Sequence, residues 1–296
     1  MSVFARRLSM YSRRALRTAG GRGLTARIFF LHMPKCGGTA LAEGMYGTVA
    51  LHRRIGVIDA PATRIAAARL HHGSGDPLLC HEDLPFGHET FALREGIALT
   101  HLSWTTQMVH GHVLATTCLL SALGQDWALV TMLRDPFARA ISNYRMAVRA
   151  GVIPDDTDAW LEGAVGQSMA QVYLRYFSGA NVIAPGAQAE ALSRAEAHMD
   201  RFALIGFLDD PRAFQTGFDA RFGVRPHFPR RNEARGPGLS LTPVQEARLR
   251  DLLGPDQRLY DLARVRFAAR PAVQPSVTVS ADRAAQSAMD APPVRG

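Results

Sequence analysis

A short apolar run that leads into a proline–lysine–glycine loop is the feature that most restricts the fold of this chain. Residues 28–31 are β-favouring apolar side chains, and residues 32–38 (His-Met-Pro-Lys-Cys-Gly-Gly) follow directly. Pro34 ends a strand ladder, the two glycines permit tight turns, and Thr39 begins a helical pattern. A strand, a glycine loop and a helix start in this order point several backbone N–H groups at one place, where the helix end adds positive partial charge. We therefore expect an anion-binding junction within an α/β fold.

Lys35 is the only lysine in the 296-residue chain, in which every other basic side chain apart from histidine is arginine. Its ammonium is a compact point charge on a flexible stem, which suits a tight loop where one positive charge meets one oxygen. The loop differs from the P-loop of nucleotide triphosphatases, because there the lysine follows the glycines and here it precedes them. We expect Lys35 to supply a full charge, and Thr39 a hydroxyl donor, to a phosphate-like anion.

A second strand-to-helix junction lies near the middle of the chain. Residues 127–133 form an apolar run that predicts a buried strand, and residues 134–144 read Arg-Asp-Pro-Phe-Ala-Arg-Ala-Ile-Ser-Asn-Tyr. Asp135 is a natural N-cap and Pro136 a natural first residue of a helix. Apolar side chains then recur at helical spacing and are expected to face the sheet, namely Phe137, Ala140, Ile141 and Tyr144.

Two polar side chains of this junction are placed to bind a second anion. Arg134 stands at the end of the strand and Ser142 two turns into the helix, so we expect them to converge on one phosphate. Arginine offers a two-pronged donor and serine a single hydroxyl. Arg139 lies between them, and the pattern leaves open whether it is exposed or ion-paired.

Both junctions resemble sequence motifs of PAPS-dependent sulfotransferases. Residues 34–39 (Pro-Lys-Cys-Gly-Gly-Thr) are similar to the 5′-phosphosulfate-binding loop of that family, and residues 134–144 look like its 3′-phosphate motif. The family takes 3′-phosphoadenylyl sulfate (PAPS) as donor and releases PAP. The resemblance implies that the donor is bound by Lys35, Cys36, Gly37, Gly38, Thr39, Ala40, Arg134 and Ser142.

A basic segment at residues 227–233 (His-Phe-Pro-Arg-Arg-Asn-Glu) lies where members of the family often carry a basic–asparagine loop over the nucleotide. The resemblance therefore adds Arg231 and Asn232 to the expected donor contacts. An ordinary basic loop fits the same residues equally well.

A histidine pair supplies the candidate catalytic base. Residues 107–113 (Gln-Met-Val-His-Gly-His-Val) form a strand-like run that carries His110 and His112 near its end. Moving a sulfuryl group to a hydroxyl requires removal of the hydroxyl proton, and histidine exchanges protons near neutral pH. By similarity to the carbohydrate (uronyl 2-O-like) branch of the family, His112 is the expected base and His110 an auxiliary or replacement. Glu82 remains a second choice.

No metal is expected in the site. His71, His72, Cys80, His81 and Glu82 stand close together, but their spacing fits no standard zinc pattern and the segment favours a polar loop. Three cysteines (Cys36, Cys80 and Cys118) cannot form a disulfide framework, which favours a reducing compartment and a cytoplasmic protein. Positive charge near Cys36 is expected to lower the pKa of its thiol and make it sensitive to oxidation.

Positive charge is concentrated at the N-terminus. The formal net charge is +8, yet residues 1–27 contain seven arginines and no acid, which leaves 27 basic and 26 acidic residues elsewhere. A near-neutral body without interleaved aromatic positions argues against nucleic-acid binding. We expect a flexible basic arm over residues 1–27, with peripheral membrane contact left open by the helical spacing of Phe4, Leu8 and Tyr11. No secretory signal or membrane anchor is expected.

The remaining sequence predicts a single α/β domain over residues 28–270, followed by a disordered tail over residues 271–296. A further strand is expected at residues 203–207. Helical patterns cover residues 61–70, 158–177, 187–199, 211–222, 242–253 and 256–267. Strands that alternate with helices predict a parallel sheet of about five strands with helices on both faces, and the resemblance makes this sheet P-loop-NTPase-like.

The combined expectation is a sulfotransferase that moves the sulfuryl group of PAPS to a hydroxyl of a carbohydrate or glycolipid by in-line displacement. Lys35 and the loop N–H groups would stabilise the leaving phosphate oxygen. One alternative is a kinase-like, nucleotide-dependent phosphoryl transferase, against which the position of the lysine and the lack of an obvious metal-holding aspartate argue. The other is a catalytically silent nucleotide-binding module.

Overall fold

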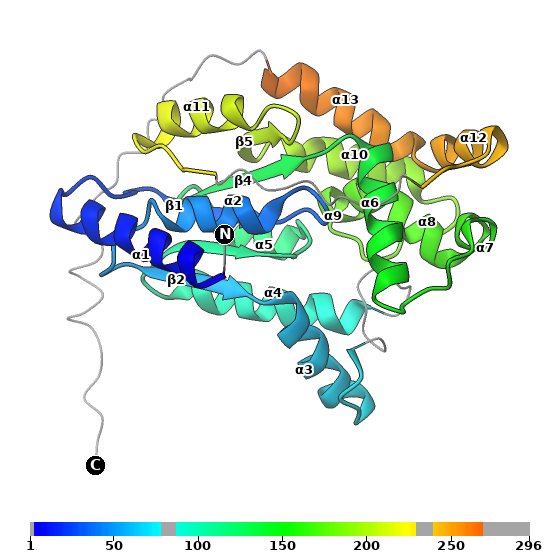
Figure 1. Ribbon diagram of the computed structural model, residues 1–296, viewed down its shortest axis with the longest axis horizontal. Coiled ribbons are helices and arrows are strands. Elements are labelled where there is room, and N and C mark those ends of the chain that lie inside the picture. The colour runs from blue at the N-terminus through cyan, green and yellow to red at the C-terminus, as the bar shows by residue number, and fades with distance from the viewer. Residues whose placement is uncertain (1–2, 78–86, 229–238, 269–296) are drawn as a thin grey trace.

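A parallel sheet of five strands forms the centre of the structure (Figure 1). The computed structural model describes residues 3–77, 87–228 and 239–268. The strands are β1 Arg27–Leu31, β2 Arg54–Ile58, β3 Thr106–Gly111, β4 Trp127–Leu133 and β5 Phe202–Phe207. They lie in the order β2-β3-β1-β4-β5, and all neighbouring pairs are parallel. The expected α/β fold with about five parallel strands is confirmed.

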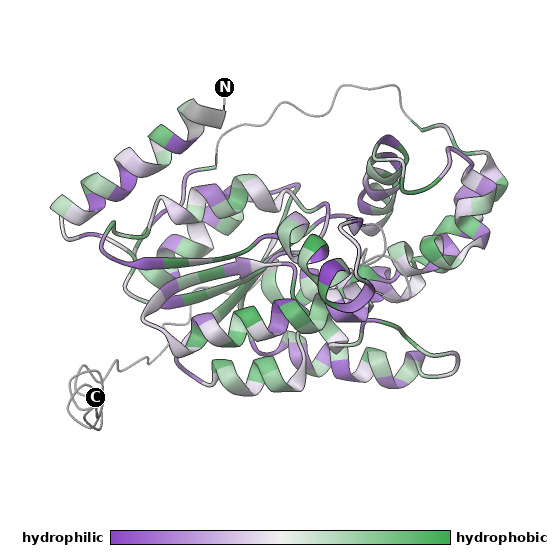
Figure 2. Ribbon diagram, turned by 90° about the horizontal axis from the view of Figure 1, so that it is seen from below, coloured by the Kyte–Doolittle hydropathy of each residue, from purple (hydrophilic) through white to green (hydrophobic). Residues whose placement is uncertain are grey.

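Helices cover both faces of this sheet (Figures 1 and 2). The helices of the described residues are α1 Val3–Ala19, α2 Gly38–Tyr46, α3 Ala60–His72, α4 His88–Ser103, α5 Thr117–Leu123, α6 Pro136–Arg149, α7 Thr157–Glu162, α8 Ala164–Ala170, α9 Val172–Ser178, α10 Gln188–Met199, α11 Pro211–Phe222, α12 Pro243–Leu252 and α13 Gly254–Ala268. One face of the sheet packs against α4, α5, α9, α10 and α13. The other face packs against α2 and α11.

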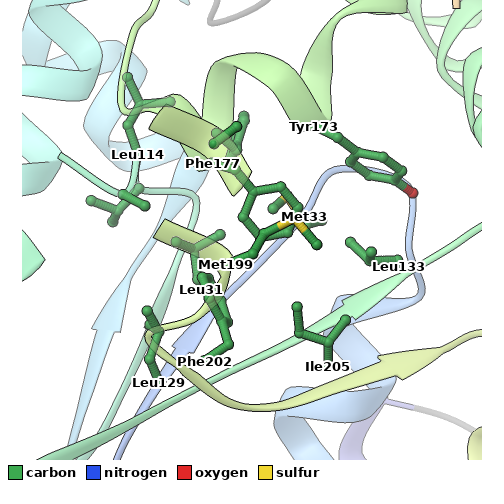
Figure 3. Packing of buried hydrophobic residues seen from close by; sticks show 14 of the residues in the cluster. Leu31, Met33, Leu114, Leu129, Leu133, Tyr173, Phe177, Met199, Phe202 and Ile205 are labelled. Atoms are coloured by element: carbon green, nitrogen blue, oxygen red, sulfur yellow. The ribbon is translucent and has the colours of Figure 1, made fainter. Parts of the chain in front are cut away.

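The central strands are buried on both sides, so successive side chains enter opposite cores. Phe29 belongs to the core cluster on one face, and Phe30 to the cluster on the other. Figure 3 shows part of the larger cluster, where Leu31 and Ile205 of the sheet gather with Phe177 of α9. Each fully buried side chain of this size contributes roughly 1.5–3 kcal/mol to folding. This double burial explains why these strands appear in the sequence as continuous apolar runs.

A third apolar cluster lies beside the sheet, among α6, α7, α8 and α12. The rings of Tyr144 and Trp160 meet there, with centroids 4.7 Å apart. The apolar side of α6 was expected to face the sheet, and this expectation is wrong because its buried residues pack on neighbouring helices instead. The single helix expected over residues 158–177 is also wrong, because the chain changes direction at Gly163 and Gln171 and forms α7, α8 and α9.

The other expected helices are present as α3, α10, α11, α12 and α13, with ends shifted by at most two residues. The strand expected to continue to residue 113 ends as β3 at Gly111, so that His112 lies in the turn beyond it. Three elements had no counterpart in the sequence analysis, namely β2, α4 and α5. The expected tail over residues 271–296 lies outside the described residues.

Residues 3–19, expected as part of a flexible basic arm, form helix α1 on the outer side of α2 (Figure 2). Arg14 is buried and donates to the carbonyl oxygen of Val49 over 3.0 Å. Arg17 donates to the carbonyl oxygen of Gly47 over 3.0 Å. The expectation of flexibility is corrected for this segment, because its arginines bind backbone carbonyls in the loop after α2. Within the described part of the chain, no helix is both long and apolar enough to cross a bilayer.

Candidate active site

The strand order makes the carboxyl ends of β1 and β4 the position where open parallel sheets generally bind ligands. The chain leaves β1 toward β2 on one side of the sheet, and leaves β4 toward β5 on the other. Where neighbouring strands of an open parallel sheet send their connections in opposite directions, a crevice opens at their carboxyl ends. Both predicted anion-binding junctions lie at this point, one after each strand.

The loop after β1 has the backbone shape of an anion cradle. Lys35 has a φ of 62° and Gly37 a φ of 74°, whereas Cys36 between them has an ordinary negative φ. Alternation of this kind turns successive N–H groups toward one concavity. Helix α2 starts directly after Gly37 without a side-chain cap, so its first N–H groups face the same end. Thr39 is exposed and Ala40 buried in the first turn of α2.

Lys35 is held in the left-handed region although it is not a glycine. Its side chain is partly buried and crosses to α6, where Nζ lies 3.3 Å from Sδ of Met146. Its carbonyl oxygen lies 3.5 Å from a guanidinium nitrogen of Arg134. The loop after β1 and the junction after β4 are therefore in contact, as the two motifs require if they bind opposite ends of one ligand.

Gly38 is required by the ring of His32, which covers the start of α2. A Cβ added at Gly38 would lie 1.7 Å from Nε2 of His32, so any larger residue would displace the imidazole. His32 stands directly after β1, and its backbone N–H bonds to the carbonyl oxygen of Gly111 over 2.9 Å. This bond joins the loop after β1 to the end of β3, where His110 and His112 lie.

Three imidazoles form a stack at the carboxyl ends of β1 and β3. The ring centroids of His32 and His112 are 4.0 Å apart. Nδ1 of His32 lies 3.1 Å from Nε2 of His110, and Nδ1 of His110 lies 2.8 Å from the hydroxyl of Tyr46. The predicted base is therefore brought next to the anion cradle. His110, predicted as an auxiliary, sits one ring further from it, against Tyr46 of α2.

Burial favours the neutral form of two of these imidazoles, His32 and His110. Burial, and then the proximity of His112, His110 and Arg94, lowers the pKa of His32 well below its usual value. Burial, and then His112, lowers the pKa of His110 to about 3. Arg94, fully buried on α4, donates to the carbonyl oxygen of His112 over 3.3 Å and to Thr63 over 2.9 Å. It thus anchors the turn that carries the predicted base.

Tyr173 of α9 contacts both strand-to-helix junctions through its hydroxyl group. Its hydroxyl donates to the carbonyl oxygen of Arg134 over 2.5 Å and accepts from the N–H of Arg134 over 2.8 Å. The same oxygen lies 3.4 Å from Sγ of Cys36. One buried phenol therefore fixes the position of both loops. The sequence offered no signal for this role beyond an aromatic residue in a helical pattern.

The buried position of Cys36 contradicts the expected lowering of its thiol pKa. The thiol is buried, and this burial raises its pKa to about 11, against the smaller opposing effects of Tyr173 and the nearby arginines. Nearby charge was expected to lower the pKa and expose the thiol to oxidation. Desolvation outweighs the charges, so the cysteine packs in the core and contributes its backbone N–H, not a reactive sulfur, to the loop.

The side chain of Arg139 is bound inside the protein and connects α6 to neighbouring helices. It is fully buried on α6, donates to the carbonyl oxygen of Met169 over 2.6 Å and pairs with Asp256 over 3.4 Å. Asp256 also accepts from the N–H groups of Tyr173 and Leu174, each over 2.9 Å. Burial raises the pKa of Asp256 to about 6, and the opposing effect of Arg139 is smaller. The ion-paired alternative for Arg139 therefore holds, and the pair positions α9 and its tyrosine.

Of the other predicted site residues, Ser142 lies within the described part of the chain. Ser142 is partly buried on α6, after the N-cap Asp135, whose carboxylate accepts from the N–H of Ala138 over 2.8 Å. Arg231 and Asn232 lie outside the described residues, as does the second-choice base Glu82. In the described ranges, no three His, Cys, Asp or Glu side chains are grouped so as to hold a metal ion.

Comparison with protein-family models gives no match to this chain, and comparison with curated proteins gives none either.

Proposed function

We propose that this chain is a sulfotransferase that takes PAPS as donor and a hydroxyl of a carbohydrate or glycolipid as acceptor. One observation carries the proposal: the segment after β1 contacts Arg134 through Lys35 and His112 through His32. The contact between the carbonyl of Lys35 and Arg134 spans 3.5 Å, and the stack of His32 on His112 brings the base to the same loop. A donor with an anion at each end, and a base beside one of them, fits this arrangement.

Within the α/β class, we propose that the fold is P-loop-like. The anion loop follows the central strand β1, and the second anion-binding junction follows its neighbour β4. This is the position at which open parallel sheets bind phosphorylated ligands. The order of lysine and glycines keeps the loop distinct from that of nucleotide triphosphatases.

The residues support the donor in separate ways. PAPS supplies an activated sulfuryl group, whose bond to the 5′-phosphate breaks as the acceptor oxygen bonds to sulfur, with PAP as leaving group. Lys35 and the N–H groups from Cys36 to Thr39 stabilise negative charge on the 5′-phosphate oxygen, whereas the N–H of Ala40 bonds to the carbonyl oxygen of Gly37 over 3.1 Å. Arg134 and Ser142 bind the 3′-phosphate. His112, in its neutral form, takes the acceptor proton.

The fit of the loop to such a donor rests on its geometry. The φ alternation at Lys35 and Gly37 makes a concavity lined by N–H groups, and a Cβ at Gly38 would fill the space taken by His32. A cytoplasmic location is proposed with the same function, since PAPS is a soluble donor and the buried Cys36 is a free thiol.

Transfer of label from sulfur-labelled PAPS to a pool of glycans and glycolipids tests the proposal. Wild-type protein is expected to label an acceptor, and Lys35→Ala and His112→Ala are each expected to lose about 100-fold or more of the rate. Arg134→Ala is expected mainly to weaken PAP binding, measured by calorimetry. The matched controls are His71→Ala and Arg212→Ala, which remove exposed side chains on α3 and α11.

Each alternative gives a different result. ATP-dependent and magnesium-dependent transfer of phosphate, without use of PAPS, would establish a kinase-like enzyme. PAP binding without any transfer, unchanged in His112→Ala, would establish a silent binding module. Full transfer by the His112→Ala variant would remove this residue as the base while leaving the donor site intact.

A further inference from the structure

Helix α1 carries its basic side toward the protein. Arg14 donates to the carbonyl oxygens of Val49 over 3.0 Å and Ala50 over 3.2 Å. Arg17, one turn later, donates to the carbonyl oxygens of Gly47 over 3.0 Å and Arg225 over 3.2 Å. Because charged groups hold the inner side of the helix, its apolar side is turned outward. This is the reverse of an ordinary surface helix, whose apolar side packs on the core.

The outward side of α1 is an apolar surface of large side chains. Leu8, Tyr11 and Leu16 are 57%, 51% and 73% exposed, and their spacing places them on one side of the helix. Leu51 continues the surface from the loop after α2: it is 46% exposed, and its N–H bonds to the hydroxyl of Thr18 over 2.8 Å. Figure 2 shows α1 outside α2, with none of the described helices or strands over its outer side.

The segment of the chain that carries this surface is strongly basic. Residues 1–58 contain nine arginines and Lys35 but a single acid, Glu43. Arg7 precedes Leu8 on α1, and Arg22 and Arg53 lie in the loops after α1 and α2; all three are exposed. A helix with large apolar side chains outward and arginines at its border has the composition that binds the headgroup region of anionic membranes.

We propose that α1, together with the loop that carries Leu51, docks on an anionic lipid surface. Leu8, Tyr11, Leu16 and Leu51 enter the acyl boundary, and Arg7, Arg22 and Arg53 meet lipid phosphates. A second copy of the chain is a poorer occupant, because a symmetric pairing would bring the arginine border of one copy against that of the other. The proposal is independent of the sulfotransferase function.

Co-sedimentation of the full chain with phosphatidylcholine vesicles, with and without phosphatidylglycerol, tests this surface. Wild-type protein is expected to sediment with the anionic vesicles, less so as salt is raised, and to remain in solution with phosphatidylcholine alone. Leu16→Asp is expected to reduce the partition coefficient about tenfold. The matched control is Leu70→Asp, which changes a leucine that is 70% exposed on α3 and should leave binding at the wild-type value.

Three outcomes would overturn the proposal. The first is equal sedimentation with neutral and anionic vesicles, and the second is equal loss of binding in the Leu16→Asp and Leu70→Asp variants. The third is a concentration-dependent dimer, seen by light scattering, that Leu16→Asp dissociates. Far-UV circular dichroism of each variant separates loss of the surface from loss of the fold. Retained sulfate transfer by Leu16→Asp toward a soluble acceptor would show that the two proposals stand apart.

Discussion

Mild acid should weaken the fold through the ring of His110. In the folded chain this imidazole is enclosed by His32, which it meets over 3.1 Å, and by Tyr46, over 2.8 Å. Burial, and then the proximity of His112, lowers its pKa from 6.5 to about 3. The unfolded chain therefore binds a proton at pH values where the folded chain does not. Stability is fully present above about pH 6.5 and is lost as the pH falls toward 3.

The size of this loss follows from the two pKa values. Between about pH 7 and about pH 5, a histidine that titrates at 6.5 when unfolded and at about 3 when folded removes about 2 kcal/mol of unfolding free energy. His32 adds a loss of the same sign, because burial lowers its pKa as well. The fold should tolerate neutral and alkaline conditions better than weak acid.

Urea denaturation at both pH values, on wild-type protein and on His110→Asn, isolates the contribution of this ring. The variant loses hydrogen bonds and is expected to be less stable throughout, but its stability should fall by about 2 kcal/mol less on acidification. His71→Asn, which removes an exposed histidine on α3, controls for the loss of one imidazole. If His110→Asn and wild type lose the same free energy between the two pH values, the reasoning about the buried stack is refuted.

The remaining predictions concern the loop and its support. Gly38→Ala should abolish PAP binding measured by calorimetry, because its Cβ would lie 1.7 Å from a neighbouring imidazole, whereas Gly96→Ala on α4, with nothing within 4 Å, should bind normally. Tyr173→Phe should destabilise the protein by about 1–3 kcal/mol in urea and weaken PAP binding, since it leaves buried backbone groups unpaired; unchanged affinity would deny it a positioning role. Iodoacetamide followed by peptide mapping should modify exposed Cys118 well before buried Cys36, and the reverse order would contradict the raised thiol pKa.

Local signals in the sequence were sufficient for the elements on which the site is built. The apolar runs of β1 and β4 are buried on both faces, and Asp135 caps α6 as its position before Pro136 predicts. Strand β2 gave no such signal, because it lies at the sheet edge, begins with an exposed arginine and carries Gly56 at its centre. Helix α4 was missed because its buried positions include Thr90 and Arg94, which break the apolar stripe.

The site was partly predictable for the same reason. Lys35 and His112 belong to patterns that are contiguous in sequence, so their proposed roles rest on local signals that need no fold. His32 and Tyr173 act through contacts with residues far away in the chain, and only the sheet order and the position of α9 create those contacts. The pKa of the Cys36 thiol could not be predicted from the sequence. Neighbouring charges can be counted in a sequence, but the desolvation that raises this pKa depends on how the core packs.

The position of Tyr173 in the chain has a consequence for fragments of this protein. A piece that ended after α6 at Arg149 would contain both motifs of the proposed anion site and the histidine pair, but not the phenol that contacts both loops. Affinity for the donor should therefore report the assembly of the C-terminal half, through the clamp that Asp256 places on α9. A chain truncated there would keep the residues of the proposed site but lose the contacts that hold them in position.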